Sequence, residues 1–260
     1  MAADQSPTLH RAVPAALLAA LLVLAGCGML GDSQPPSDDR ALEIRNETID
    51  ALENVDSYGM SMDVSASAEG RSESISATGD GIANRTARLM RMNMTVQSRT
   101  VTSYLQNRTA YTQCPSPWSG WGEQNQSTDI EWLTLTPLGR QVELFERTNV
   151  YWDGTATVDG HDTAVIVAHP TQETLSSLPG ESQTDLANPD ANVENITAKL
   201  WVDRETSRPV RSLLRLQISG NGGEAMATVT LDFEDYDEPI TVKIPEISDH
   251  EIRSLGCPGG

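Results

Sequence analysis

The sequence predicts an α+β fold that is mostly β and is built on an antiparallel sheet. Three features of the 260-residue chain lead to this prediction. One amphipathic helical segment precedes the strands. Apolar and polar residues then alternate through a series of short segments, which is the period-2 pattern of strands with one buried face. Turn-forming residues separate these segments, so strands adjacent in sequence are expected to pair as a meander.

The first helix is predicted over residues 38–55, "DDRALEIRNETIDALENV". Two acids open it, which favours a helix start. Its apolar residues recur mostly at helical spacing: Leu42, Ile44, Ile49, Leu52 and Val55. A second helix is predicted over 136–148, with a proline near its start, and a short third one over 171–178. The first helix needs a partner surface for its apolar face.

The strand segments are predicted in three groups. They lie at 58–68, 71–85, 87–97 and 99–114, then at 150–160 and 161–170, and finally at 196–218, which turns near "RETSRP", and at 225–236. Residues 179–195 contain acids and two prolines with little to bury, so a long loop is expected there.

The N-terminus has the features of an export signal. Residues 12–26 carry no charge, but the run is shorter than the ~20 apolar residues that a membrane-spanning helix needs. "LAG" directly before Cys27 resembles the lipobox of bacterial and archaeal lipoproteins, in which the cysteine carries the lipid. We therefore expect a signal peptide at 1–26, a flexible tether at 27–37 and a folded domain at 38–260. The alternative is an uncleaved signal anchor.

The charge balance is strongly acidic. Eighteen Lys plus Arg against 37 Asp plus Glu give a net charge of -19, and only Lys199 and Lys243 are lysines. A surface of this kind repels nucleic acid, so no nucleic-acid partner is expected. Acid excess with few lysines is typical of extreme halophiles, which suggests a haloarchaeal source. An ordinary acidic protein is the alternative.

Two further features fit a location outside the cytoplasm. If Cys27 carries lipid, Cys114 and Cys257 remain as an even pair and are expected to form a disulfide, the alternatives being free thiols or an intermolecular bond. Six Asn-x-Ser/Thr triplets are candidate glycosylation sites. They begin at Asn46, Asn84, Asn93, Asn107, Asn125 and Asn195.

The C-terminal third of the sequence resembles a known superfamily. "AKLWVDRETSRPVRSLLRLQI" followed by "ATVTLDFEDYDEPITVKIP" is similar to the last hairpin and strand of LolA-like lipoproteins, which include the outer-membrane lipoprotein carriers and the mycobacterial LppX and LprG proteins. "ALENVDSYGMSMDV", a helix leading into a long strand, also fits. Ser207 replaces the usual glycine of the corner. The resemblance covers the first helix and about the last 60 residues well, and the middle only by order of elements. An unrelated meander of strands is the alternative.

The resemblance implies a strongly curved antiparallel half-barrel with helices covering its concave face and an apolar cavity that holds acyl chains. Flexible apolar side chains at alternating positions could line such a cavity, although a methionine stripe is more often ordinary core. The candidates are Met60, Met62, Met90, Met92, Met94, Leu213, Leu214, Leu216 and Ile218.

The sequence contains no pattern that predicts catalysis, a cofactor or a metal. The histidines His10, His161, His169 and His250 have no metal-ligand spacing. No GxSxG elbow or phosphate-binding glycine loop occurs. The acidic run 232–239 does not match the EF-hand calcium pattern. An enzyme would require His161 or His169 to converge with buried carboxylates.

Taken together, these features predict a non-enzymatic lipoprotein, anchored on the extracytoplasmic face of the cell membrane, that binds a lipid or another hydrophobic ligand. The competing hypothesis is a structural or sensory envelope module with a fully packed core, whose partner is another envelope protein.

Overall fold

A computed structural model describes residues 34–69, 74–179, 192–220, 223–253 and 256–257. The signal peptide, Cys27 and most of the tether lie outside these ranges. All of the elements below belong to one compact unit, residues 36–260.

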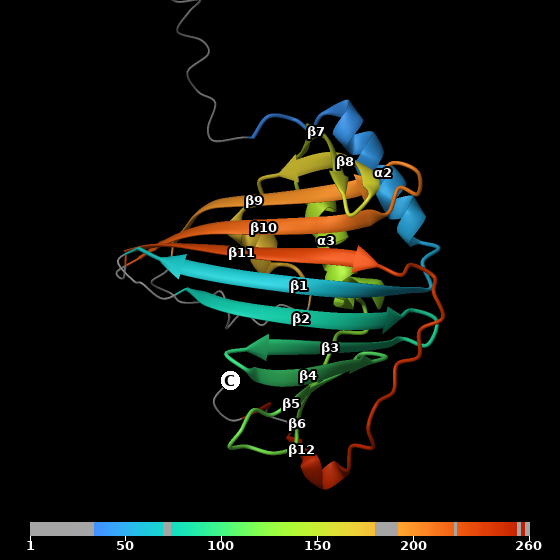
Figure 1. The fold of residues 1–260 in the computed structure, drawn as a ribbon, viewed down its shortest axis with the longest axis vertical. Coiled ribbons are helices and arrows are strands. Elements are labelled where there is room, and N and C mark those ends of the chain that lie inside the picture. Colours follow the sequence, from blue (N-terminus) through green and yellow to red (C-terminus); the bar gives the residue numbers. More distant parts are fainter. Residues whose placement is uncertain (1–33, 70–73, 180–191, 221–222, 254–255, 258–260) are drawn as a thin grey trace, which may run out of the picture. The chain divides into compact units, whose positions relative to one another are not determined.

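Twelve strands form a single sheet in the described part of the chain (Figure 1). They are β1 (Ser57–Ala68), β2 (Ile75–Asn84), β3 (Leu89–Val96), β4 (Arg99–Gln106), β5 (Thr109–Gln113), β6 (Trp121–Asn125), β7 (Val150–Val158), β8 (His161–Ala168), β9 (Asn192–Asp203), β10 (Pro209–Gly220), β11 (Gly223–Glu234) and β12 (Ile252–Arg253). The order across the sheet is β12-β6-β5-β4-β3-β2-β1-β11-β10-β9-β8-β7, so within the described residues the sheet is not closed between β12 and β7.

The sheet consists of two meanders joined by one long-range pairing. The strands from β1 to β6 pair in sequence order, as do those from β7 to β11, and every neighbouring pair is antiparallel except β12 with β6. This confirms the predicted antiparallel β-rich fold. The two meanders meet where β1 pairs with β11, from Gly59 opposite Glu234 to Ala68 opposite Ala225. Sequence adjacency did not predict that pairing, and it also missed the short strands β6 and β12.

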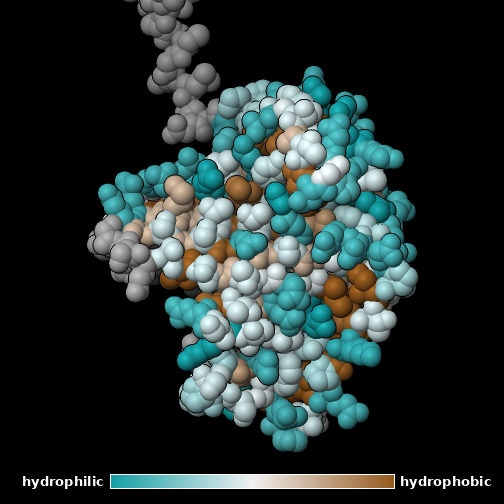
Figure 2. Space-filling view, in the orientation of Figure 1, coloured by the Kyte–Doolittle hydropathy of each residue, from teal (hydrophilic) through white to brown (hydrophobic). Residues whose placement is uncertain are grey.

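Alternation gives the sheet an inner and an outer face. On β10 the even-numbered residues Ser212, Leu214 and Leu216 lie on the inner face, which carries the buried side chains, and the odd-numbered residues lie on the outer face. Figure 1 views the sheet from its outer side, with α3 behind the strands. In that orientation most of the surface is hydrophilic or intermediate, with hydrophobic side chains only in patches (Figure 2). Leu213, expected to point inward, therefore lies on the outer face, because adjacent strand residues point apart.

Helix α2 (Asp39–Leu52) is shorter at both ends than the predicted segment 38–55 and contacts α3, β7 and β8. Its start is tied to β7, because the backbone N–H of Trp152 donates to Asp38 at 2.7 Å and Arg40 stacks on the Trp152 ring at 3.5 Å from the centroid. Its apolar face joins two core clusters. Leu52 belongs to one, with Met60, Met90 and Phe233 among others, and Ala41 to the second.

Helix α3 (Pro137–Glu146) is held in place by the preceding 3-10 turn η2 (Leu133–Leu135). Thr136 is its N-cap and accepts a hydrogen bond from the Gly139 N–H, while its own hydroxyl donates to the Leu133 carbonyl at 2.6 Å. A Cβ at Gly139 would lie 2.1 Å from that carbonyl oxygen, so only glycine allows the turn to approach the helix this closely. A short helix α4 (Gln172–Ser176) follows β8, with Thr171 as its N-cap.

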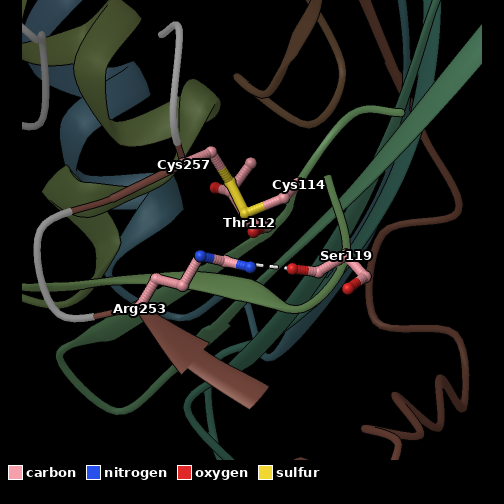
Figure 3. The surroundings of a disulfide bond; sticks show 5 residues. All are labelled: Thr112, Cys114, Ser119, Arg253 and Cys257. Atoms are coloured by element: carbon pink, nitrogen blue, oxygen red, sulfur yellow. Dashed lines mark hydrogen bonds between the residues drawn. A yellow bond between two sulfur atoms is a disulfide. The ribbon is translucent and has the colours of Figure 1, made fainter. Parts of the chain in front are cut away.

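After β11, the C-terminal segment runs along the ends of the first meander (Figure 1). Ser57 donates to the Glu238 carbonyl at 2.6 Å and Asn84 donates to the Ile240 carbonyl at 3.0 Å. The segment passes the 3-10 turn η3 (Asp249–Glu251) and ends with β12 beside β6. There Cys257 forms a disulfide with Cys114, and Arg253 donates to the Ser119 carbonyl at 3.0 Å (Figure 3). The C-terminus is thus fixed to the end of the first meander.

Replacing both Cys114 and Cys257 by alanine is expected to lower the free energy of unfolding by about 2–5 kcal/mol. The sulfurs close a loop with a sequence separation of 143 residues, and loops of this size give the largest chain-entropy contribution. Urea unfolding at high salt measures the change. Reductant should bring the wild type to the stability of the double variant and leave the variant unchanged. A double variant as stable as the oxidised wild type would contradict this expectation.

Candidate ligand-binding cavity

An apolar cavity of about 280 Å³ lies between the inner face of the sheet and the helices α3 and α4. Strands β1, β3, β10 and β11 form one wall and the two helices form the other. The lining residues are Met62, Met92, Pro137, Arg140, Gln141, Leu144, Leu175, Leu178, Ser212, Leu214, Leu216, Val229 and Leu231. Leu231 belongs to the core cluster of β1, β2 and β3, whereas Leu144, Leu175 and Leu216 belong to that of β8, β9 and β10. The cavity therefore lies where the two clusters meet.

Four of the predicted cavity residues line this cavity: Met62, Met92, Leu214 and Leu216. Met60 and Met90 lie in the packed core instead, at 4% and 9% exposure, and Ile218 packs against the second cluster. Apart from Leu213, the predicted residues lie on the inner face, but alternation cannot predict depth along the strand. The lining residues of β11, α3 and α4 were missed, although the period-2 pattern of β11 and the apolar face of α3 already marked them as inward.

Glycines on β2 make room for methionine side chains of the neighbouring strands. A Cβ at Gly81 would lie 2.3 Å from Cε of Met60, and one at Gly79 would lie 2.6 Å from Sδ of Met94. Because these positions have no side chain, Met60 and Met94 occupy the space above β2. The inner face continues beyond them to Ile75 and Val96, which are 59% and 40% exposed.

Three polar residues interrupt the apolar lining. Arg140 and Gln141 come from the first turns of α3, and Ser212 comes from β10. Ser212 is only 1% exposed. The Oε1 atom of Gln141 is buried and has no hydrogen-bond partner. The cavity is thus apolar along its walls with a few polar groups, which is the usual composition of a site for a lipid-like ligand.

The glycosylation candidates differ in accessibility. Asn46, Asn107, Asn125 and Asn195 are exposed. Asn84 and Asn93 are half-buried, and their amide nitrogens donate hydrogen bonds to the Ile240 carbonyl and the Asp80 carboxylate. A glycan on Asn84 or Asn93 would displace these bonds, so the four exposed sites remain the stronger predictions.

The structure brings His161 next to a buried carboxylate, which is the condition set above for an enzymatic reading. Nδ1 of His161 lies 2.6 Å from Oδ2 of Asp203, which is 7% exposed. Asp203 also accepts hydrogen bonds from the backbone N–H groups of Glu205 and Thr206 and from the Thr206 hydroxyl. These contacts hold the turn between β9 and β10. The two backbone N–H donors show that the carboxylate caps this turn, which is a structural use.

The acidic run 232–239 has a similar structural use. Asp237 accepts from the Asp56 N–H at 2.8 Å and pairs with Arg208 at 2.5 Å, and Asp232 pairs with Arg211. Within the described ranges, no group of three His, Cys, Asp or Glu side chains is arranged to hold a metal ion. The turn that follows Asp203 and the acidic run thus fix the end of the β9–β10 hairpin to β11 and β1.

The described residues contain no helix that is both long and apolar enough to span a membrane.

Comparison with solved structures identifies the fold. The chain superposes on the Mycobacterium tuberculosis lipoprotein LppX with a TM-score of 0.50 at 17% identity, over 80% of this chain and 100% of LppX. LprF from Mycobacterium bovis gives 0.47 at 15% identity, over 81% and 99% of the two chains. A LolA-superfamily protein from Nitrosomonas europaea gives 0.31 at 10% identity, over 81% and 96%. No family profile and no curated sequence matches this chain. The chain therefore shares the LppX fold, which supports the LolA-like resemblance at the level of fold.

Asp203→Asn is expected to lower the free energy of unfolding by about 1–2 kcal/mol at neutral pH, because hydrogen bonds to a charged group are lost. Burial alone would raise the pKa of Asp203, but the hydrogen bonds from Thr206, His161 and Glu205 outweigh it and hold the pKa below its usual value. A lowered folded-state pKa stabilises the fold above the unfolded-state pKa, and this contribution disappears as pH falls through the folded-state value.

Denaturant unfolding of wild type and Asp203→Asn between pH 7 and pH 2 measures this effect. The difference between the two proteins should shrink below about pH 4. Asp162→Asn is the matched control, since it removes only an exposed pair with Arg204 and should cost about 0–1 kcal/mol. A pH-independent difference for Asp203→Asn would show that the charge is not what stabilises the turn.

Proposed function

We propose that this protein binds a hydrophobic ligand, a lipid or an acyl chain, in the cavity between α3 and the inner face of the sheet. The observation that carries the proposal is that this cavity lies between two well-packed core clusters and is lined mainly by flexible apolar side chains. Methionine and leucine can adjust to a chain of variable shape.

The energetics favour an occupant. An apolar ligand in the cavity would remove the leucine and methionine walls from water, and apolar surface buried in this way contributes about 25 cal/mol per Å². The volume is close to the lower end of the ~300–1,000 Å³ range of ligand sites. A cavity of this size fits one acyl chain better than several.

We also propose that the domain works on the extracytoplasmic face of the cell membrane, held there by lipid on Cys27. The apolar run before Cys27 and the lipobox-like "LAG" support cleavage after residue 26, with 27–37 as tether and 38–260 as the ligand-binding domain. The disulfide fits an oxidising compartment. The solved protein of the same fold is described as a lipoprotein. No catalytic step is included in the proposal.

Filling the cavity should abolish ligand binding. Leu214→Trp places an indole in the cavity and is expected to weaken binding of an uncharged fluorescent lipid probe at least 10-fold, measured by titration at high salt. Leu213→Trp is the matched control, since it is the next residue on the same strand and points to the outer face. Native mass spectrometry of protein purified from its own membranes should show a lipid adduct on the wild type and none on Leu214→Trp. A bare polypeptide mass for the wild type would favour the protein-binding envelope module.

Substituting Cys27 by serine should remove the membrane anchor. The expected result is protein in the medium or an unprocessed precursor, detected by cell fractionation and by the mass of the N-terminal peptide. Ser33→Ala in the predicted tether is the control and should leave fractionation unchanged. Membrane retention of a processed Cys27→Ser protein would place the anchor elsewhere.

A further inference from the structure

The polar groups of the cavity restrict the chemistry of its ligand. Oε1 of Gln141 is buried without a hydrogen-bond partner. Ser212 is 1% exposed and lines the same cavity, so its hydroxyl is the second polar group of the lining that a ligand can reach. The two groups come from opposite walls, Gln141 from α3 and Ser212 from β10.

Unsatisfied buried polar groups are uncommon, because leaving a donor or acceptor without a partner costs about 1–3 kcal/mol. An apolar residue at position 141 would avoid this cost while keeping the cavity apolar. The unpartnered Gln141 oxygen in this apolar cavity is explained most simply if the bound ligand supplies its hydrogen bond, and Ser212 lies on the opposite wall where the same ligand group can reach it.

We propose that the ligand is an aliphatic alcohol, a lipid with a free hydroxyl group placed between Gln141 and Ser212. This inference rests on the proposed function and names the ligand class for the same cavity. A hydroxyl donates one hydrogen bond and accepts others, so it can donate to Gln141 Oε1 and accept from Ser212. An ether or ester only accepts and leaves the Gln141 oxygen unpaired.

The same argument separates an alcohol from a fatty-acid anion. An ionised carboxylate only accepts hydrogen bonds, and its charge would lie against the Gln141 oxygen. Arg140 also lines the cavity and has a partner in the structure, and decanoate in the test below measures whether its guanidinium recruits an anion. A neutral alcohol satisfies the Gln141 oxygen, whereas a carboxylate does not.

Three probes of equal chain length test the proposal: 1-decanol, decyl methyl ether and decanoate, titrated into the full domain at high salt. Wild type should bind decanol about 3- to 10-fold more tightly than the ether, the ratio expected for one hydrogen bond to a neutral group. Gln141→Leu and Ser212→Ala should each reduce this preference while keeping ether affinity within about 3-fold. Gln217→Leu, on the outer face of β10, is the control and should keep the preference.

Thermal unfolding of the ligand-free variants gives a second readout. A hydroxyl that serves the ligand breaks no bond within the protein when it is removed, so Ser212→Ala should keep the wild-type Tm or raise it by about 2–4 °C. A drop in Tm would show that the hydroxyl has a structural partner and would overturn its assignment to the ligand.

The titrations distinguish the two proposals. Equal binding of decanol and ether by the wild type, or tighter binding of decanoate, would overturn the alcohol assignment and leave the cavity as a hydrophobic site. Failure of all three probes to bind, with the protein folded, would overturn the proposed function itself.

Discussion

The pairing of β1 with β11 is the interaction on which the rest of this structure depends. These strands are separated by more than 150 residues in sequence, yet they form a continuous antiparallel ladder that joins the two meanders. Met62 lies on β1 and Leu231 on β11 directly opposite it, and both line the cavity. Without this ladder each meander would keep its local hairpins, but the wall of the cavity would be divided. The entropy of closing so long a loop must be offset by many contacts formed together, and a ladder of ten paired residues supplies them.

The cavity is a consequence of how the helices are held relative to this sheet. Helix α3 cannot settle further onto the strands without moving η2, because Gly139 and Thr136 tie the helix to the Leu133 carbonyl. On the opposite wall, the glycines of β2 draw the side chains of Met60 and Met94 away from the centre of the face. Each arrangement is locally well packed. Together they leave a space where the two core clusters meet, which is why a protein with a dense core elsewhere retains a hollow there.

Local patterns in the sequence predicted the strands well, since alternation and turn residues act over a few neighbours. They gave α2 to within a few residues and the inner face of β1 and β3, and on β10 they placed Leu214, Leu216 and Ile218 correctly but Leu213 wrongly. They did not predict the β1–β11 pairing, because nothing local distinguishes it from a continued meander. They also could not separate Met60, which is packed, from Met62, which lines the cavity two residues later on the same face. That difference depends on Gly81 of the neighbouring strand and on the position of α3, which are both tertiary. Strand β6 was missed because the loop around Trp118 interrupts its alternation.

The buried polar groups of this protein are of two kinds. Some are satisfied by hydrogen bonds within the fold and have a structural role, and others face the cavity and are available to a ligand. Asp203 is deeply buried, but the turn after β9 satisfies it through backbone and side-chain hydrogen bonds. His161 beside it looks like half of a catalytic pair and is better explained as one more partner of a turn-capping carboxylate. Oε1 of Gln141 is buried in a far more apolar place and has no such partner. Tyr58, Arg91 and Trp132 also carry buried side-chain atoms without partners, but these residues do not line the cavity. Gln141 is therefore the unsatisfied group that a ligand in the cavity can reach.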